Sequence, residues 1–391
     1  LDDKPVALLV FDLVGMNEEV VSLIRQQAER QHGIPSSKVA ITCTHTHSGP
    51  AGFTRYPDID QDAEEFVHQT IARAMDGLGE ARSTLSNAYM GYGETQLSRV
   101  CTDRNTPDQK IDTTVAVVKV VGRDGDRDQP IAILGNFPCH PTVLGADNLL
   151  FSGDLFGEAC KAIEDFYNGR TVCALTNGAE GDISTRYVRQ SQTFEESARL
   201  GGKLAEKLLE VLTSVRTYND VAHLGILTRR FPIPLKYLPD LVEARSQLAA
   251  SKKKLQRLKD EGGSHGDIRV VETEIQGAES LLESVIASKK RGTKRSVIVE
   301  MMGIRLGDII LITIPGEPFN QLGVEIKASA HPAVKVIVLG LANGYVGYFP
   351  TREAQDKRSY EVLTSQFDFR ASELLTDEAV TLVQMLQNVE S

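Results

Sequence analysis

The first part of the chain alternates between apolar runs and a helical pattern. Residues 5–14 are apolar except for Asp12, which is typical of a buried strand. Residues 17–33 carry apolar positions at helical spacing, with Asn17 able to cap the start and Gly33 ending the pattern. Residues 35–44 form a second apolar run. This strand–helix–strand order predicts a parallel strand pair joined by a right-handed crossover.

The same alternation continues along the chain. Strands are expected over 83–97, 113–121, 131–137, 171–176, 296–302, 308–314 and 334–340, and helices over 60–78, 155–166 and 193–212. The predicted fold class is therefore α/β, with a mixed, largely parallel β-sheet core flanked by helices. We expect residues 1–391 to form a single domain.

The composition changes after Pro239. Residues 240–290 are rich in Ala, Leu, Lys and Glu at helical spacing, and residues 261–266 interrupt them with Glu-Gly-Gly-Ser-His-Gly. This pattern predicts an inserted, protruding antiparallel helical hairpin. Such an element could cover a pocket as a lid, or it could join copies of the chain into a homo-oligomer.

Four of the predicted strands end in polar residues that lie close to Gly or Pro. These residues are His45 and His47 after 35–44, His140 after 131–137, Glu317 after 308–314, and Tyr348 after 334–340. His45 and His47 should share one face, because alternate residues of an extended segment point the same way. Open α/β sheets bind ligands at the carboxyl ends of their strands. The pattern therefore predicts a ligand site at these strand ends.

The residue types at these ends suit a metal. Two neutral imidazoles, a carboxylate and a water make a hydrolytic zinc site when one coordination position stays open. A single His-x-His is weak evidence, because two histidines in a polar turn give the same pattern. The four strand ends together favour the metal interpretation. His47 could serve a substrate while His45 holds the metal. Asp12 and Asp154 could orient the imidazoles or cap turns.

Bulk composition excludes several classes of function. The net charge of −10 argues against a nucleic-acid surface, because phosphate binding needs basic clusters. No apolar run approaches the roughly 18–20 residues of a transmembrane segment. The five cysteines are scattered, which argues against a disulfide framework. The compartment stays open: the chain begins without methionine, so a removed leader would make the protein secreted or periplasmic.

Several short motifs together resemble the N-terminal catalytic domain of the neutral ceramidase family, zinc-dependent hydrolases that cleave the amide of ceramide. They occur in the family's order between residue 5 and about residue 365: Thr-His-Thr-His-Ser-Gly-Pro at 44–50, Cys-His-Pro-Thr at 139–142, Ser-Gly-Asp at 152–154, Gly-Asp-Ile-Ser at 181–184, Pro-Gly-Glu-Pro-Phe at 315–319, and Ala-Asn-Gly-Tyr-Val-Gly-Tyr-Phe-Pro-Thr at 342–351. Each motif alone is weak, whereas the ordered set is specific.

The resemblance implies a role for seven residues. The zinc ligands it implies are His45, His140, Glu317 and Tyr348, and the catalytic or substrate-contacting residues are His47, Arg104 and Tyr360. His47 would transfer a proton, Tyr360 would contact substrate, and Arg104 would lie near the scissile carbonyl. A dication favours the phenolate form of a tyrosine, which makes Tyr348 acceptable as a ligand.

Three departures from the family pattern bear on substrate. Gly178 stands where the family has a substrate-contacting serine, and the hairpin at 240–290 is extra. We also expect the chain to be a short member that lacks the family's immunoglobulin-like C-terminal domain. We therefore expect Zn²⁺-dependent hydrolysis of a small-molecule amide by a metal-activated water, with a substrate other than ceramide itself. The alternatives are hydrolysis of a lactam or ester, and a metal-stabilised scaffold that binds partners through its hairpin.

Overall fold

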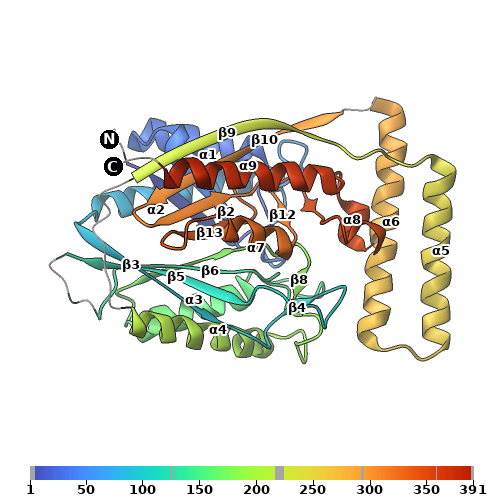
Figure 1. Ribbon diagram of the computed structural model, residues 1–391, viewed down its shortest axis with the longest axis horizontal. Coiled ribbons are helices and arrows are strands. Elements are labelled where there is room, and N and C mark those ends of the chain that lie inside the picture. Colours follow the sequence, from blue (N-terminus) through green and yellow to red (C-terminus); the bar gives the residue numbers. More distant parts are fainter. Residues whose placement is uncertain are drawn as a thin grey trace.

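The computed structural model describes residues 5–123, 126, 128–215, 224–291, 295–357 and 359–388. Two β layers face each other, and helices cover the outer side of each layer (Figure 1). The prediction of a mixed α/β fold with a helix-flanked sheet core is confirmed.

The first β layer contains a four-stranded sheet and a parallel strand pair beside it. The sheet has the order β13-β11-β10-β9, formed by β9 (Leu224–Pro234), β10 (Ser296–Leu306), β11 (Ile309–Thr313) and β13 (Lys335–Leu339). The pair is β1 (Ala7–Phe11) and β2 (Val39–Cys43). The backbone N–H of Cys43 donates to the carbonyl of Leu341, just after β13, and so joins the pair to the sheet.

The second β layer is a four-stranded sheet of order β3-β5-β6-β7. Its strands are β3 (Ala88–Gln96), β5 (Thr114–Gly122), β6 (Ala132–Phe137) and β7 (Val172–Asn177). The two layers meet through small and branched side chains, among them Ala116 and Val118 of β5 and Ile304 of β10. This core between the sheets fixes the position of one layer relative to the other.

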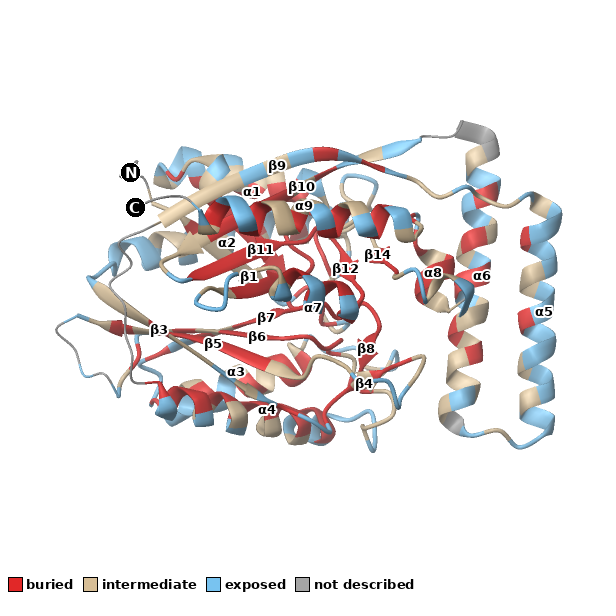
Figure 2. Ribbon diagram, viewed as in Figure 1, coloured by how far each residue is buried: buried red, intermediate tan, exposed pale blue. Residues whose placement is uncertain are grey.

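Helices bury one apolar face each against the sheets. The helices are α1 (Glu18–His32) and α2 (Gln61–Ser83) against β1–β2, α3 (Asp154–Phe166) and α4 (Phe194–Ser214) against the second sheet, and α7 (Asn320–Ala328) and α9 (Phe369–Gln387) against the first sheet. Figure 2 shows the buried residues gathered in the strands and on the sheet-facing sides of α3, α4 and α9.

The first crossover forms as its sequence predicts. The Asn17 side chain accepts a hydrogen bond from the N–H of Val20 at 3.1 Å and so caps α1. Gly33 ends the helix with φ of 64°, a left-handed conformation that costs glycine little. β1 and β2 then pair in parallel, from Ala7 opposite Val39 to Phe11 opposite Cys43.

Parallel pairs are fewer than predicted. In the two four-stranded sheets and the pair beside them, β1–β2, β6–β7 and β11–β13 are parallel, whereas β3–β5, β5–β6, β9–β10 and β10–β11 are antiparallel. For β10 and β11 the reason lies in the connection, because a short loop joins antiparallel neighbours whereas parallel neighbours need a long crossover. Gly307 and Asp308 alone connect β10 to β11. The strand expected from residue 83 begins at Ala88, because α2 continues to Ser83.

Residues 240–290 form two helices, α5 (Leu241–Asp260) and α6 (His265–Arg291), at one end of the molecule (Figure 1). They leave the sheet between the paired ends of β9 and β10, where Pro234 lies opposite Ser296. Salt bridges Lys252–Glu279 and Lys259–Glu272 link them in antiparallel order. The hairpin therefore interrupts a pair of neighbouring strands.

Helix α6 also packs on α8 (Tyr360–Thr364). Ala278 and Leu281 form a small apolar cluster with Leu363. A Cβ on Gly277 would lie 3.0 Å from the Cβ of Leu363, so glycine permits this close approach. One helix of the hairpin is thus docked on the domain.

Two further expectations concern the whole chain. All five cysteines lie in described segments and none of them forms a disulfide. Within the described ranges, no helix has both the length and the apolar character that a membrane crossing requires.

Two adjacent glycines of α4 test the packing of the helical layer. A Cβ on Gly201 would lie 2.7 Å from the carbonyl oxygen of Leu155 in α3, whereas a Cβ on Gly202 would meet open space. We expect Gly201→Ala to lower the free energy of unfolding by roughly 1–3 kcal/mol, because backbone must move. Gly202→Ala should raise it by about 0.5–1 kcal/mol. Urea unfolding of both variants measures the difference, and equal effects would contradict this packing.

Candidate metal centre and active site

Strand ends from both β layers meet at one place. His45 and His47 follow β2, and His140 follows β6. Two short strands, β12 (Glu317–Pro318) and β14 (Tyr348–Phe349), pair in parallel with Glu317 directly opposite Tyr348. A Cβ on Gly316 would lie 2.3 Å from the carbonyl oxygen of Gly347, so only glycine fits before β12.

Backbone carbonyls fix the orientation of two imidazoles. The Nδ1 atom of His45 lies 2.5 Å from the carbonyl oxygen of Val14. The Nδ1 atom of His140 lies 2.9 Å from the carbonyl oxygens of both Glu180 and Ile183. A carbonyl can only accept a hydrogen bond, so each Nδ1 carries the proton. When the ring is neutral, its Nε2 atom therefore carries no proton and presents a lone pair.

Both Nε2 lone pairs face the same carboxylate. The Oε2 atom of Glu317 lies 3.3 Å from Nε2 of His45 and 3.0 Å from Nε2 of His140. All three side chains are at most 1% exposed. Neither His140 Nε2 nor Glu317 Oε2 has a hydrogen-bond partner in the part of the chain that is described. Buried electron pairs facing one another are costly unless a cation or proton lies among them. These residues therefore fit a metal ion.

The charge states of these groups agree with that arrangement. Burial raises the pKa of Glu317, but interactions with the neighbouring imidazoles outweigh it and hold the pKa well below 4.5, so the carboxylate is ionised. Burial lowers the pKa of His140 well below 6.5, and the charge of Arg104 adds to this. The hydroxyl of Tyr345 donates to Oε1 of Glu317 at 2.7 Å and so fixes the second carboxylate oxygen.

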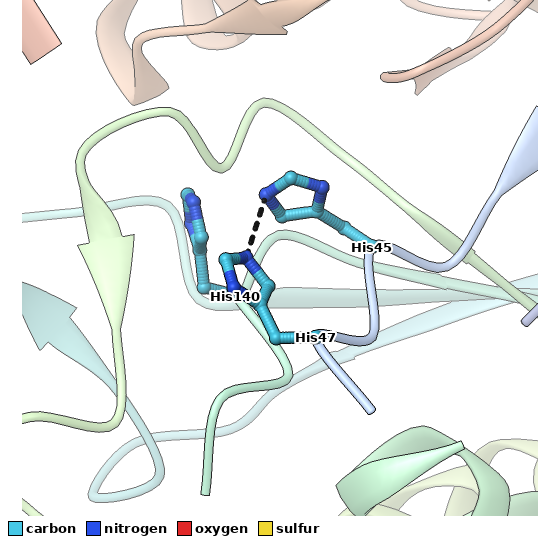
Figure 3. Close-up of side chains that lie close together, drawn as sticks. All are labelled: His45, His47 and His140. Carbon is cyan, nitrogen blue, oxygen red and sulfur yellow. Dashed lines mark hydrogen bonds between the residues drawn. The ribbon is translucent and has the colours of Figure 1, made fainter. Parts of the chain in front are cut away.

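His47 completes a group of three histidines with His45 and His140 (Figure 3). One ring nitrogen from each lies within 4.8 Å of the others, and Nε2 of His47 is 3.4 Å from Nε2 of His45. Desolvation and the nearby His45 together lower the pKa of His47 to about 3. His47 is exposed where the other two are buried. Its position suits either a metal ligand or a group that exchanges protons with a substrate.

Tyr348 lies against His140, with ring centroids 6.4 Å apart and the rings stacked. Its hydroxyl oxygen accepts a hydrogen bond of 3.1 Å from Arg104. Burial raises the pKa of Tyr348 well above 10, as does the charge of Glu317. The phenol therefore stays protonated unless a bound cation offsets these effects.

Arg104 is held by partners on three sides. Its Nε atom lies 2.5 Å from a carboxylate oxygen of Glu361, and its Nη2 atom donates to the carbonyl of Gly181 at 2.8 Å as well as to Tyr348. Tyr360, the first residue of α8, places its ring 6.0 Å from that of Tyr348. The structure thus brings all seven residues singled out from the sequence into one cluster.

Two neighbouring pockets open at this cluster. The larger, about 640 Å³, is lined by the ligand candidates His45 and Glu317, and the smaller, about 350 Å³, includes Arg104. Four residues line both pockets: His47, Gln276, Tyr348 and Tyr360. A substrate could therefore pass over the histidines with one half in each pocket.

Helix α6 forms a wall of both pockets. Arg269, Thr273 and Gln276 line the smaller pocket, and Gln276 and Ser280 line the larger one. These four residues are three or four positions apart, so they lie on one helical face. Of the two roles expected for the hairpin, this geometry supports covering the pocket, while oligomer formation stays a prediction.

Sequence reasoning missed several residues of the site. Tyr345 lies three residues before Tyr348, and Glu361 follows Tyr360, so both are close in sequence to residues already singled out. The polar face of α6 could have been found from its spacing alone, but nothing in the sequence says where it docks. The carbonyls that fix the imidazoles leave no side-chain signal.

Three other residues discussed from the sequence, Asp12, Asp154 and Gly178, support the local structure. Asp12 accepts a hydrogen bond from the Thr44 hydroxyl, and Asp154 accepts from the backbone N–H groups of Leu144 and Leu155. Both aspartates therefore brace the chain, and carbonyls orient the imidazoles instead. Gly178 packs against Pro138, where a Cβ would lie 3.1 Å from the Pro138 Cβ, and it is not among the residues that line the two pockets.

Comparison of sequences places this site in a known context. Residues 2–197 match the pattern described as neutral/alkaline non-lysosomal ceramidase, N-terminal, a segment that contains all three clustered histidines. The neutral ceramidase of Pseudomonas aeruginosa is 24% identical, over 87% of this chain and 58% of that protein. The neutral ceramidase of Mycobacterium tuberculosis is also 24% identical, over 91% of this chain and 64% of that protein.

Comparison of structures agrees on the fold. The crystal structure of the Pseudomonas aeruginosa neutral ceramidase superposes with a TM-score of 0.71 at 18% identity, over 97% of this chain and 66% of that one. The chain thus spans about three fifths of the length of these two curated relatives. From the sequence match and the shared fold together, this chain belongs to the neutral/alkaline non-lysosomal ceramidase family.

Proposed function

We propose that this chain is a zinc-dependent hydrolase that cleaves an N-acyl amide bond. The observation that carries the proposal is the meeting of two fixed imidazole lone pairs and a buried carboxylate beside two pockets. Family membership supports the same reaction class, because the curated relatives are named neutral ceramidases, after an N-acyl amide substrate.

The residues that would hold the metal are His45, His140 and Glu317, with Tyr348 as the fourth ligand. Neutral imidazole and carboxylate donors are those that zinc takes in hydrolytic sites. When bound, zinc would supply Lewis acidity, which polarises a carbonyl and makes a water nucleophilic near neutral pH.

We assign proton transfer to His47. Its ring is exposed whereas those of His45 and His140 are buried, so it can exchange protons with a substrate. It lies between the two pockets, where the scissile bond would cross. The Nε2 atom could take the proton of the attacking water and return it to the amide nitrogen as the amine leaves.

We assign oxyanion stabilisation to Tyr360 and a supporting role to Arg104. Burial raises the pKa of Tyr360, so its hydroxyl stays a hydrogen-bond donor. It lines both pockets and so can reach a substrate carbonyl. Arg104 already donates to Tyr348 and Gly181 and pairs with Glu361, which suits holding Tyr348 in place.

The two pockets also bear on substrate shape. Two pockets that meet at the cluster suit a linear amide with two extended halves better than a compact lactam. Gly178 gives no reason to exclude ceramide, because it packs against Pro138 and is not among the residues that line the two pockets. The zinc-loaded protein should therefore be assayed with N-acyl-sphingosine, N-acyl amino acids and simple lactams. Turnover of a linear N-acyl amide is expected, and stoichiometric zinc without any turnover would favour the scaffold alternative.

Metal content tests the ligand assignment. We expect one zinc per chain, and loss of most zinc in His45→Ala, His140→Ala and Glu317→Gln, because each removes a donor. His68→Ala is the matched control, since His68 is 56% exposed on α2. Elemental analysis after zinc supplementation measures the ratio. Full zinc retention in His140→Ala would refute the assignment.

Activity measured together with metal content separates the two roles of histidine. His47→Ala should keep most of its zinc but lose roughly 10²–10⁴-fold in turnover, because proton transfer contributes about that much. His45→Ala should lose zinc and turnover together. Equal zinc loss in both variants would show that His47 is a ligand.

A further inference from the structure

The smaller pocket carries an unusual number of arginines. Its walls include Arg104, Arg186, Arg189 and Arg269, and no Asp or Glu is among the described residues that line it. The chain as a whole is acidic, with a net charge of −10. A concentration of positive charge here is therefore a local feature of this pocket.

Only one of the four charges is closely compensated. Arg104 has its buried ion pair with Glu361. Arg186 and Arg189 donate to backbone carbonyls, those of Arg104 and Thr142, and neither forms an ion pair with a carboxylate in the described part of the chain.

Carboxylates farther from the pocket compensate the charge weakly. Arg269 lies 3.5 Å from Glu272, and Glu272 also lies 3.5 Å from Lys259. Asp154 acts on Arg189 electrostatically while its oxygens accept from backbone N–H groups. An excess of positive charge therefore remains.

The three remaining guanidinium groups repel one another. Burial and the charges of Arg104 and Arg269 together lower the pKa of Arg186 to about 10, although the charge of Glu361 partly opposes them. Burial likewise lowers the pKa of Arg189, again with a contribution from Arg269. Arg186 and Arg189 both stay charged at neutral pH. Holding like charges together costs free energy that a bound anion would offset.

The pocket is continuous with the candidate active site. His47, Tyr348 and Tyr360 form its inner end, and Gln276 links it to the larger pocket. The larger pocket is lined by neutral residues apart from its histidines and Glu317. The smaller pocket is thus cationic and the larger one is not. The two pockets would therefore bind chemically different halves of a substrate.

We propose that the smaller pocket binds an oxyanion group, a carboxylate or a phosphate, carried by one half of the amide substrate. Arg186, Arg189 and Arg269 would bind this group, because guanidinium groups donate paired, charge-assisted hydrogen bonds to planar and tetrahedral oxyanions. The proposal deepens the proposed function and rests on it. It identifies the substrate class as an anionic N-acyl amide.

Matched substrates with one acyl chain test the preference. N-decanoylglycine offers a carboxylate, N-decanoyl-O-phosphoethanolamine offers a phosphate, and N-decanoylethanolamine is the neutral counterpart. We expect kcat/KM at least roughly tenfold higher for an anionic amide than for the neutral one. The better of the two anionic amides identifies the oxyanion. Equal kcat/KM for all three would overturn the proposal and leave amide hydrolysis standing.

Variants connect the preference to the arginines. Arg269→Gln should abolish the preference by lowering kcat/KM much more for the anionic amides than for the neutral amide. Arg189→Gln should act the same way. Arg257→Gln is the matched control, because Arg257 is 78% exposed on the other helix of the hairpin and pairs with Glu261. An undiminished preference in both pocket variants would refute the assignment.

A binding measurement separates this proposal from the hydrolysis on which it builds. N-decanesulfonylglycine and N-decanesulfonylethanolamine replace the amide with a sulfonamide that is not hydrolysed. Calorimetry should show tighter binding of the carboxylate compound to the wild-type chain, and equal binding of both to Arg269→Gln. This result without turnover of any amide would support the anion site and refute the hydrolase. Equal binding of both to the wild-type chain would refute the anion site.

Discussion

The site depends on three backbone carbonyls that accept hydrogen bonds from imidazole Nδ1 atoms. The carbonyl of Val14 fixes His45, and those of Glu180 and Ile183 fix His140. Each ring must therefore turn its Nε2 lone pair toward the Glu317 carboxylate, and burial keeps water from separating them. Electron pairs that face each other inside a protein need a positive charge between them. The same carbonyls act as the outer partners that set the tautomer and direction of metal-binding histidines.

This arrangement links the two β layers. His45 and Glu317 follow strands of the first layer, whereas His140 follows β6 of the second. An ion held by all three would join the layers at their strand ends, so its binding free energy would add to the stability of the domain. The docked helix α6 then closes the site from outside and lines both pockets. The fold thus supplies the candidate metal ligands from its core and part of the pocket lining from an insertion.

The sequence could predict the ligand candidates because each follows an apolar run and lies close to Gly or Pro. Polar side chains in that position are visible without knowing how the strands pair. It could not predict how the sheets divide into parallel and antiparallel pairs, because pairing depends on contacts distant in the chain. The cluster of arginines in the smaller pocket could not be predicted for a related reason. Arg186 and Arg189 follow β8 (Ile183–Ser184) and Arg269 lies on α6, and only docking brings them to one pocket.

X-ray absorption at the zinc edge tests the central claim most directly, because it reports the ligands of the ion whatever the activity. The purified, zinc-loaded chain should show two imidazole nitrogens at about 2.0–2.1 Å, with oxygen ligands at about 2.0–2.2 Å and no sulfur. His140→Ala should lose one imidazole from this set or lose the metal. A spectrum of oxygen ligands alone, or one with sulfur from the cysteines, would contradict the account.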